Sequence, residues 1–121
     1  SIKVSKILKS FREWLSNNSD NGMRVYGYGA AAKASTILNS INLEVGLITA
    51  IADVSLEKQN RFMPPHGIKI ISPEILFTEN PTDIVIFPWN ISVEIATYLK
   101  ANLGEKVRLW CAIPEMHQVK A

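Results

Sequence analysis

The fold of this chain is decided by the stretch Met23-Arg24-Val25-Tyr26-Gly27-Tyr28-Gly29-Ala30-Ala31-Ala32-Lys33. Its first six residues are mostly apolar and include β-prone types, which predicts a strand over residues 23–28. After the glycines, apolar residues recur at helical spacing, at Ala31, Ala34, Ile37, Leu38 and Ile41. A strand that turns through glycines into a helix is the opening unit of a Rossmann-like α/β domain.

The spacing Gly27-x-Gly29-x-x-Ala32 matches the nucleotide-binding pattern G-x-G-x-x-A. The first small residue allows a tight turn, the second lets backbone N–H groups approach a phosphate, and the third lets the helix pack close to the strand. The N-terminus of the following helix favours an anion. The pattern predicts a phosphate-binding turn formed by Gly27, Tyr28, Gly29, Ala30 and Ala31, with Lys33 one helical turn further on. The alternative is a tight turn without a ligand, with Lys33 as a surface lysine.

Strands and helices alternate along the rest of the chain. Further strands are predicted over residues 45–52, 68–71, 83–87 and 106–113, and further helices over residues 2–16, from Pro73 to Asn80, and from Ile91 to Leu103. Alternation of this kind predicts a mostly parallel sheet with helices on both faces. We expect one Rossmann-like α/β domain of three layers over residues 1–121, with five strands in the order 3-2-1-4-5. Residues 1–20 would form an amphipathic helix and a loop, and residues 23–114 the α/β core.

A second candidate edge lies where the fourth predicted strand ends, at Pro88-Trp89-Asn90. In the proposed order this strand neighbours the first, and ligands of open α/β sheets bind in the crevice where the strand order reverses. Trp89 offers a flat face for a ring, and Asn90 offers both a donor and an acceptor. The alternatives are that Asn90 caps the next helix and that Trp89 packs over the sheet edge.

Two further positions belong to loops after the second predicted strand. Asp53 closes that strand, and in a dinucleotide site an acid at this place would bond the ribose hydroxyls. It lies further from the glycine turn than the acid of the usual pattern, which follows the turn by about 20 residues. Lys58 begins a donor-rich polar connection that runs to Gly67. Taken alone, this connection is typical of a solvated loop, and His66 within it is typical of a loop hydrogen-bonder.

The overall composition excludes several classes of protein. With 121 residues, 47% hydrophobic and 20% charged, the chain is a globular domain, and its net charge of +2 is too small to predict a nucleic-acid or membrane partner. The single cysteine, Cys111, excludes an internal disulfide and a cysteine-cluster zinc site, which favours a cytoplasmic location. We identify no set of catalytic residues and no metal ligands in the sequence. Since the chain begins at Ser1 and not at Met, we expect it to be a piece of a longer protein.

Several blocks in order resemble a known family. They are Tyr26 to Lys33, Asp53 through Lys58-Gln59 to Pro64, Ile70 to Pro73-Glu74, and Asp83 through Pro88-Trp89-Asn90 with Glu94. Together they resemble the C-terminal domain of S-adenosylmethionine-dependent sugar C-methyltransferases, which act on nucleotide-linked deoxysugars. The blocks span roughly residues 24 to 114, which is most of the chain.

The resemblance implies a part of a three-part enzyme. Such enzymes have a zinc-binding N-terminal part, a central methyltransferase domain that holds the methyl donor, and a Rossmann-like C-terminal domain that helps to hold the nucleotide-sugar. This chain is similar to the third part, so the resemblance implies no cofactor in this domain. It places S-adenosylmethionine and the zinc site in missing domains. It also implies that a nucleotide-sugar, a dTDP-sugar, contacts the turn from Gly27 to Lys33, Asp53, Lys58, Trp89 and Asn90.

One departure from the family pattern concerns the loop at Pro64-Pro65, where relatives read Pro-Gly. Proline fixes φ and has no N–H, so a backbone donor that relatives have in this loop is in doubt here.

Two other functions remain open at this point. The glycine turn and Asp53 also suit an NAD(P)-binding domain of an oxidoreductase. A non-catalytic interaction domain is the third possibility, with the amphipathic first helix packing on a neighbouring domain or a second copy.

Overall fold

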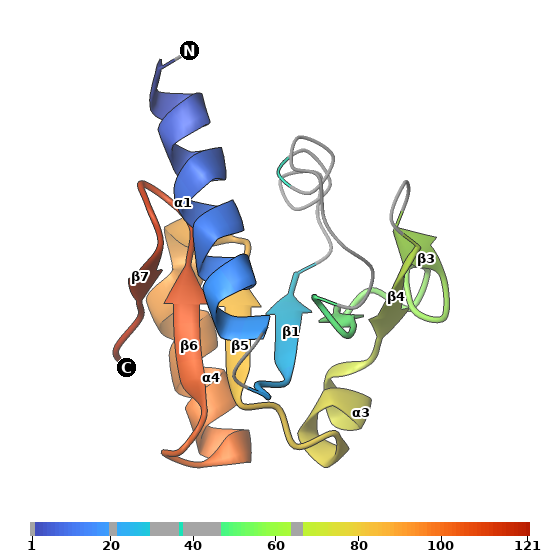
Figure 1. Cartoon of the computed structure of the whole chain (residues 1–121). Helices are drawn as coiled ribbons and strands as arrows, with labels where there is room; N and C mark the ends of the chain where they lie inside the picture. Colours follow the sequence, from blue (N-terminus) through green and yellow to red (C-terminus); the bar gives the residue numbers. More distant parts are fainter. Residues whose placement is uncertain (1, 20–21, 30–36, 38–46, 64–66) are drawn as a thin grey trace.

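The computed structural model describes residues 2–19, 22–29, 37, 47–63 and 67–121. They form one sheet with helices on both of its faces (Figure 1). The strands are β1 (Val25–Tyr28), β2 (Ile51–Ala52), β3 (Phe62–Met63), β4 (Ile68–Ile71), β5 (Asp83–Ile86), β6 (Arg108–Cys111) and β7 (His117–Gln118). The helices are α1 (Ile2–Ser19), α3 (Pro73–Thr78), the 3₁₀ turn η1 (Trp89–Ile91) and α4 (Ser92–Leu103).

The strand order is β3-β4-β2-β1-β5-β6-β7. Its five inner strands are parallel and follow the predicted order 3-2-1-4-5, which confirms the Rossmann-like class. The order reverses between β1 and β5, whose register pairs Tyr28 with Ile86. The carboxyl ends of these two strands therefore meet at one edge of the sheet, the edge toward which the arrowheads point in Figure 1.

The expected number of strands was wrong, because the sheet has seven and not five. The additional strands, β3 and β7, are two residues long and pair antiparallel with β4 and β6 at the two edges. Two residues are too few to show the alternation from which a strand is recognised in a sequence. β3 lies in the connection that we interpreted as a polar loop, and β7 follows residue 114, at which we expected the α/β core to end.

Two helices end at residues other than those expected, since α3 stops at Thr78, before Asn80, and α1 runs past residue 16. α1 continues to Ser19, beyond the stop expected at residue 16. The side-chain amide of Asn18 donates to the carbonyl of Trp14 at 2.7 Å, so this polar residue bonds back to its own helix. At the start of α3 the expectation holds, since the hydroxyl of Ser72 accepts from the N–H of Ile75 at 3.2 Å and Pro73 is the first helical residue.

The core has a layer on each side of the sheet. On the α1 side, Phe11 and Leu15 pack against β5 and against Phe87, which follows it. We call the residues that directly follow a strand its exit. The rings of Phe11 and Phe87 lie 6.1 Å apart. On the other side, α3 and α4 pack Leu76, Ile95, Ala96 and Leu99 against the sheet. In Figure 1, α1 crosses in front of the sheet and α4 lies behind it.

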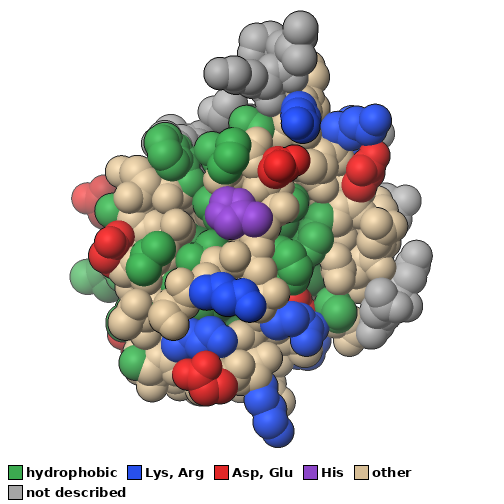
Figure 2. Space-filling model, turned by 90° about the vertical axis from the view of Figure 1, so that its left-hand side faces the viewer, with side chains coloured by type: hydrophobic (Ala, Val, Ile, Leu, Met, Phe, Trp, Pro, Cys, Tyr) green, Lys and Arg blue, Asp and Glu red, His purple; other side chains and the backbone are tan. Residues whose placement is uncertain are grey.

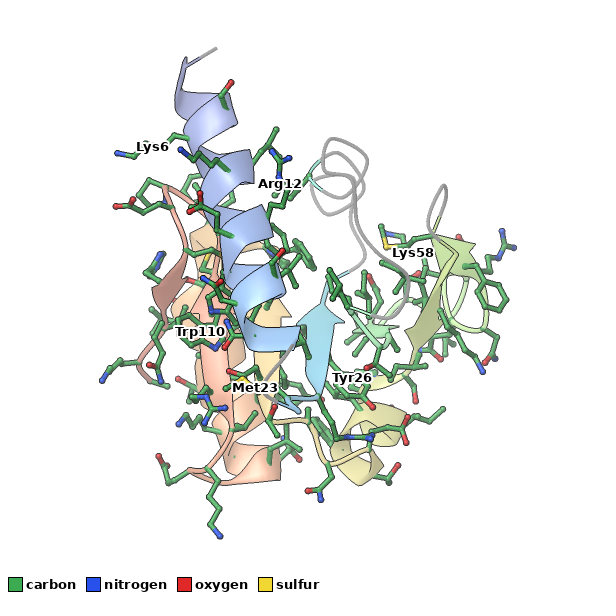
Figure 3. All side chains as sticks on the ribbon, in the orientation of Figure 1. Lys6, Arg12, Met23, Tyr26, Lys58 and Trp110 are labelled. Carbon is green, nitrogen blue, oxygen red and sulfur yellow. The ribbon has the colours of Figure 1, made fainter. Side chains whose placement is uncertain are left out.

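A buried carboxylate joins β5 to β6 under α1. Asp83 is fully buried and accepts from Arg108 at 2.8 and 3.0 Å and from the indole N–H of Trp110 at 2.8 Å. The Trp110 ring lies 5.0 Å from that of Trp14 on α1, and Figure 3 shows Trp110 between this helix and β6. The network holds the amino end of β5 against β6.

β1 carries glycines because its neighbours come very close. A Cβ at Gly27 would stand 2.8 Å from Phe87 and 2.9 Å from Ile51, and a Cβ at Gly29 would stand 2.6 Å from Cδ of Pro88. Gly29 also has φ +90°, a conformation that side chains disfavour. The exit of β1 is therefore packed directly against the exit of β5.

We predict that Trp110→Phe destabilises the domain by about 1–3 kcal/mol, because it removes a donor from the buried Asp83 carboxylate. Urea unfolding followed by circular dichroism measures this, with Tyr98→Phe at an exposed ring as the control. A double-mutant cycle with Asp83→Asn separates the hydrogen bond from the ring packing. A coupling energy of zero between the two positions would contradict the network.

We also predict that Gly29→Ala costs more stability than Gly104→Ala. The two glycines have nearly equal φ, +90° and +89°, but a Cβ at Gly104 meets nothing within 4 Å. Both substitutions thus carry the cost of a positive φ, and the additional loss at Gly29 reports the collision with Pro88, which we expect to exceed about 1 kcal/mol. Equal losses of unfolding free energy in urea would show that the two exits are not in contact.

Candidate functional site

The structure brings together the two segments that the sequence singled out. The N–H of Phe87 donates to the carbonyl of Tyr28 at 3.0 Å, and Gly29 then packs against the ring of Pro88. The N–H of Gly29 donates to the carbonyl of Ala52 at 2.7 Å, which ties the same exit to β2. The ends of three neighbouring parallel strands thus form one edge, the place where open α/β sheets bind ligands.

The predicted turn is described only in its first part. Gly27 and Tyr28 are buried within β1 and Gly29 follows directly. Ala30, Ala31 and Lys33 lie outside the described residues, as does most of the helix expected after them. Ile37, from that expected helix, is described and is buried in the core on the α1 side.

Trp89 and Asn90 form η1 immediately beyond Pro88. Trp89 is 44% exposed, so it does not pack fully over the sheet edge. Asn90 does not cap α4, because the cap position is Ile91 and no side chain caps this helix. Of the two structural alternatives for these residues, the capping role is excluded.

Asp53 and Lys58 lie in the connection after β2. Asp53 is buried at the carboxyl end of this strand, and its Oδ1 accepts from the N–H of Ser55 at 2.8 Å. The amide of Gln59 donates to the Asp53 carbonyl at 2.9 Å, which closes the loop over that strand end. Lys58 is exposed on the same loop (Figure 3). Binding of a ligand by these two residues stays a prediction.

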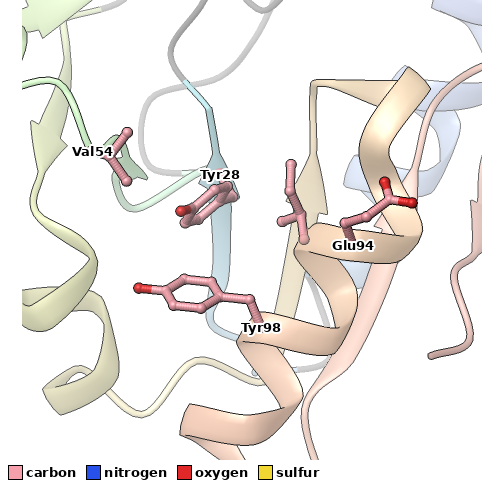
Figure 4. Close-up of a pocket in the computed structure, with 5 residues that line it drawn as sticks. Tyr28, Val54, Glu94 and Tyr98 are labelled. Carbon is pink, nitrogen blue, oxygen red and sulfur yellow. The ribbon is translucent and has the colours of Figure 1, made fainter.

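An open pocket of about 350 Å³ borders this edge on the α4 side of the sheet. Its lining residues come from β1, from the loop after β2 and from the first half of α4; they are Tyr28, Val54, Glu94, Ile95 and Tyr98. Figure 4 shows the hydroxyl groups of Tyr28 and Tyr98 pointing to the same side, while the carboxylate of Glu94 points away from both rings. The pocket is mostly apolar with a few polar groups, as small-molecule sites are.

Two of the lining rings contact each other, and one of them contacts a third ring outside the lining. Tyr28 and Tyr98 lie 6.2 Å apart with an interplanar angle of 61°, and Phe77 of α3 lies 5.8 Å from Tyr98 at 62°. Such edge-to-face pairs are favourable beyond the area they bury. Tyr98 thus contacts two other rings while 41% of its surface stays exposed.

The surroundings of Tyr28 are acidic. Burial raises the pKa of Tyr28 to about 12, with smaller contributions from Tyr98, Asp53 and Glu74. Its hydroxyl therefore keeps its proton at neutral pH and can donate a hydrogen bond. Among the described residues that line this pocket, the charged side chain is the carboxylate of Glu94.

Sequence reasoning missed Val54, Ile95 and Tyr98 as site residues. Glu94 was noted in the family resemblance but not as a contact. The available signal was Tyr98, a large aromatic residue on the exposed side of a helix that begins at the crevice. Ile95 belongs to the same helix; it is buried against the sheet and also lines the pocket.

Other candidate chemistry is limited in the described part of the chain. Cys111 is buried, and burial raises its pKa, which leaves an unreactive thiol. No group of three His, Cys, Asp or Glu residues with the placement of a metal site occurs among the described residues. The same residues include no helix with the length and apolar character needed to cross a bilayer. On the side shown in Figure 2, basic and acidic side chains are interspersed.

Comparisons with known proteins agree with this architecture. The crystal structure of UDP-D-quinovosamine 4-dehydrogenase from Vibrio fischeri superposes with a TM-score of 0.56 over 81% of this chain and 93% of that one, at 16% identity. At that identity the likeness concerns the fold alone, and it supports the Rossmann-like class.

Sequence comparison is more specific. The chain is 29% identical to the C-methyltransferase NovU of Streptomyces niveus over 116 residues, which are 96% of this chain and 28% of that relative. The chain therefore spans little more than a quarter of the relative's length. A family model described as "C-methyltransferase C-terminal domain" matches residues 1–114. The resemblance inferred from the sequence blocks is thereby confirmed, and the chain belongs to the family of C-methyltransferase C-terminal domains.

Proposed function

We propose that this domain binds a nucleotide-sugar at the carboxyl ends of β1 and β5 and positions it for methyl transfer by another domain. The observation that carries the proposal is the contact between Gly29 and Pro88, which brings the end of β1 to the segment that continues into Trp89 and Asn90. A diphosphate and a sugar are covalently linked neighbours, so one ligand can engage both segments.

The parts of the ligand suit different groups. Gly29 has no side chain that would keep a phosphate away from the backbone, and backbone N–H groups at such turns favour anions. The N–H of Gly29 itself donates to Ala52, so in this proposal the donors belong to the residues that follow it. The exposed face of Trp89 can pack against a sugar ring, and the amide of Asn90 can donate to and accept from sugar hydroxyls. In this proposal Lys33 and Lys58 add positive charge for the diphosphate.

The domain's contribution to the reaction is positioning. Holding the sugar carbon near a methyl donor converts an encounter of two molecules into a reaction of bound neighbours. The proposal assigns S-adenosylmethionine to a further domain of the whole enzyme, because the glycine turn of this chain is taken by the nucleotide-sugar. We therefore expect no methyl transfer by the isolated chain.

We predict that a dTDP-sugar at millimolar concentration shifts the backbone NMR signals of Gly29, Trp89 and Asn90. The physical reason is direct contact and the local charge of the diphosphate. The signal of Gly104, at the far end of α4, is the internal control. Unchanged signals at all three residues would count against the proposal, and fluorescence enhancement of added NADH would favour a dinucleotide instead.

A variant tests the role of the tryptophan. We predict that Trp89→Ala weakens the affinity for the dTDP-sugar by about fivefold or more, since loss of an aromatic packing face costs at least about 1 kcal/mol. The control is Phe62→Ala, which removes an exposed ring from the edge strand β3. Calorimetry gives both values of Kd. Equal affinities of Trp89→Ala and Phe62→Ala would exclude Trp89 from the site.

A further inference from the structure

We propose that the pocket lined by Tyr28, Val54 and Tyr98 receives the uncharged heterocyclic base of the nucleotide. The inference rests on the proposed function and adds the orientation in which the nucleotide-sugar lies on the domain. The base would lie on the α4 side of the sheet, the diphosphate at the exit of β1, and the sugar beside Trp89 and Asn90.

The ring geometry supports a flat, apolar occupant. The ring of Tyr98 contacts the rings of both Phe77 and Tyr28, yet 41% of its surface is exposed. A side chain that is already oriented loses little freedom when a ligand stacks on it. Val54 is 70% exposed at the opposite wall, so an inserted ring would cover apolar surface on two sides.

The charges decide which part of the ligand enters. Glu94 lines the pocket, and Asp53 and Glu74 act electrostatically on Tyr28 at its floor. Negative charge near an apolar wall repels a phosphate but leaves a neutral base unaffected. Tyr28 keeps its hydroxyl proton, so the polar groups available to a base include a hydrogen-bond donor.

The pocket is continuous with the edge assigned to the diphosphate. Tyr28 lines the pocket, and the next residue, Gly29, packs on Pro88 at the crevice. Val54 likewise follows Asp53 at the end of β2. A ligand that passes over the end of β1 can therefore reach both places without crossing a strand.

The test uses two fragments of the ligand on the whole chain. Thymidine, which has no phosphate, should shift the NMR signals of Val54, Ile95 and Tyr98 and leave Gly104 unchanged. Inorganic pyrophosphate should shift Gly29 without shifting Tyr98. Thymidine shifts that are confined to Trp89 and Asn90, or that are missing altogether, would overturn the inference.

Substitutions at one helix position separate the ring from its hydroxyl. We expect Tyr98→Ala to weaken thymidine binding by about fivefold or more, the loss typical of a base-stacking ring, and Tyr98→Phe to weaken it less. Thr97→Ala, at the neighbouring exposed residue, is the matched control and should bind normally. Circular dichroism verifies that each variant is folded.

The outcomes distinguish this inference from the function on which it rests. If the dTDP-sugar binds and Tyr98→Ala leaves its affinity unchanged, the base lies elsewhere and only the inference fails. If thymidine binds beside Tyr98 while the dTDP-sugar and pyrophosphate leave Gly29 unperturbed, the proposed function fails and the pocket remains a base site.

Discussion

The contact between the backbone of Gly29 and the ring of Pro88 is the constraint on which the site depends. Parallel pairing in register, Tyr28 beside Ile86, brings the ends of β1 and β5 to the same level. A Cβ on Gly29 would stand 2.6 Å from Pro88, so only glycine lets both exits leave the sheet side by side. Two segments 59 residues apart in the sequence numbering, Gly29 and Pro88, thereby become one edge. The buried Asp83 network and the Phe11–Phe87 contact hold β5 from the α1 side.

The inner sheet could be predicted from the sequence because its signals are local and repeated. Apolar runs, Ser72-Pro73 at a helix start and Gly104 at a helix end each specify their own element, and right-handed crossovers leave few arrangements. β3 and β7 could not be predicted in this way, since two residues carry no periodicity. Their pairing depends on β4 and β6 being already in place. The network of Asp83, Arg108 and Trp110 was likewise hidden, because it joins residues of two strands.

Some residues of the candidate site could be predicted from sequence motifs, whereas others are brought to the site only by the packing of the fold. Gly27, Gly29, Trp89 and Asn90 are visible in the sequence because glycine spacing and strand ends have a known geometric meaning. Tyr98 has no such signal: its position relative to Tyr28 depends on the way α4 returns across the sheet, and its orientation depends on Phe77. The acidic surroundings of the pocket come from three separate elements. Family membership agrees with this edge being functional, and the ligand itself remains our proposal.

The most direct measurement is a crystal structure of the domain with a dTDP-sugar. The account predicts the diphosphate beside Gly29, the sugar against Trp89 and Asn90, and the base in the pocket of Tyr28 and Tyr98. A nucleotide-sugar bound at the amino ends of the strands, or on the outer surface of α1, would contradict it.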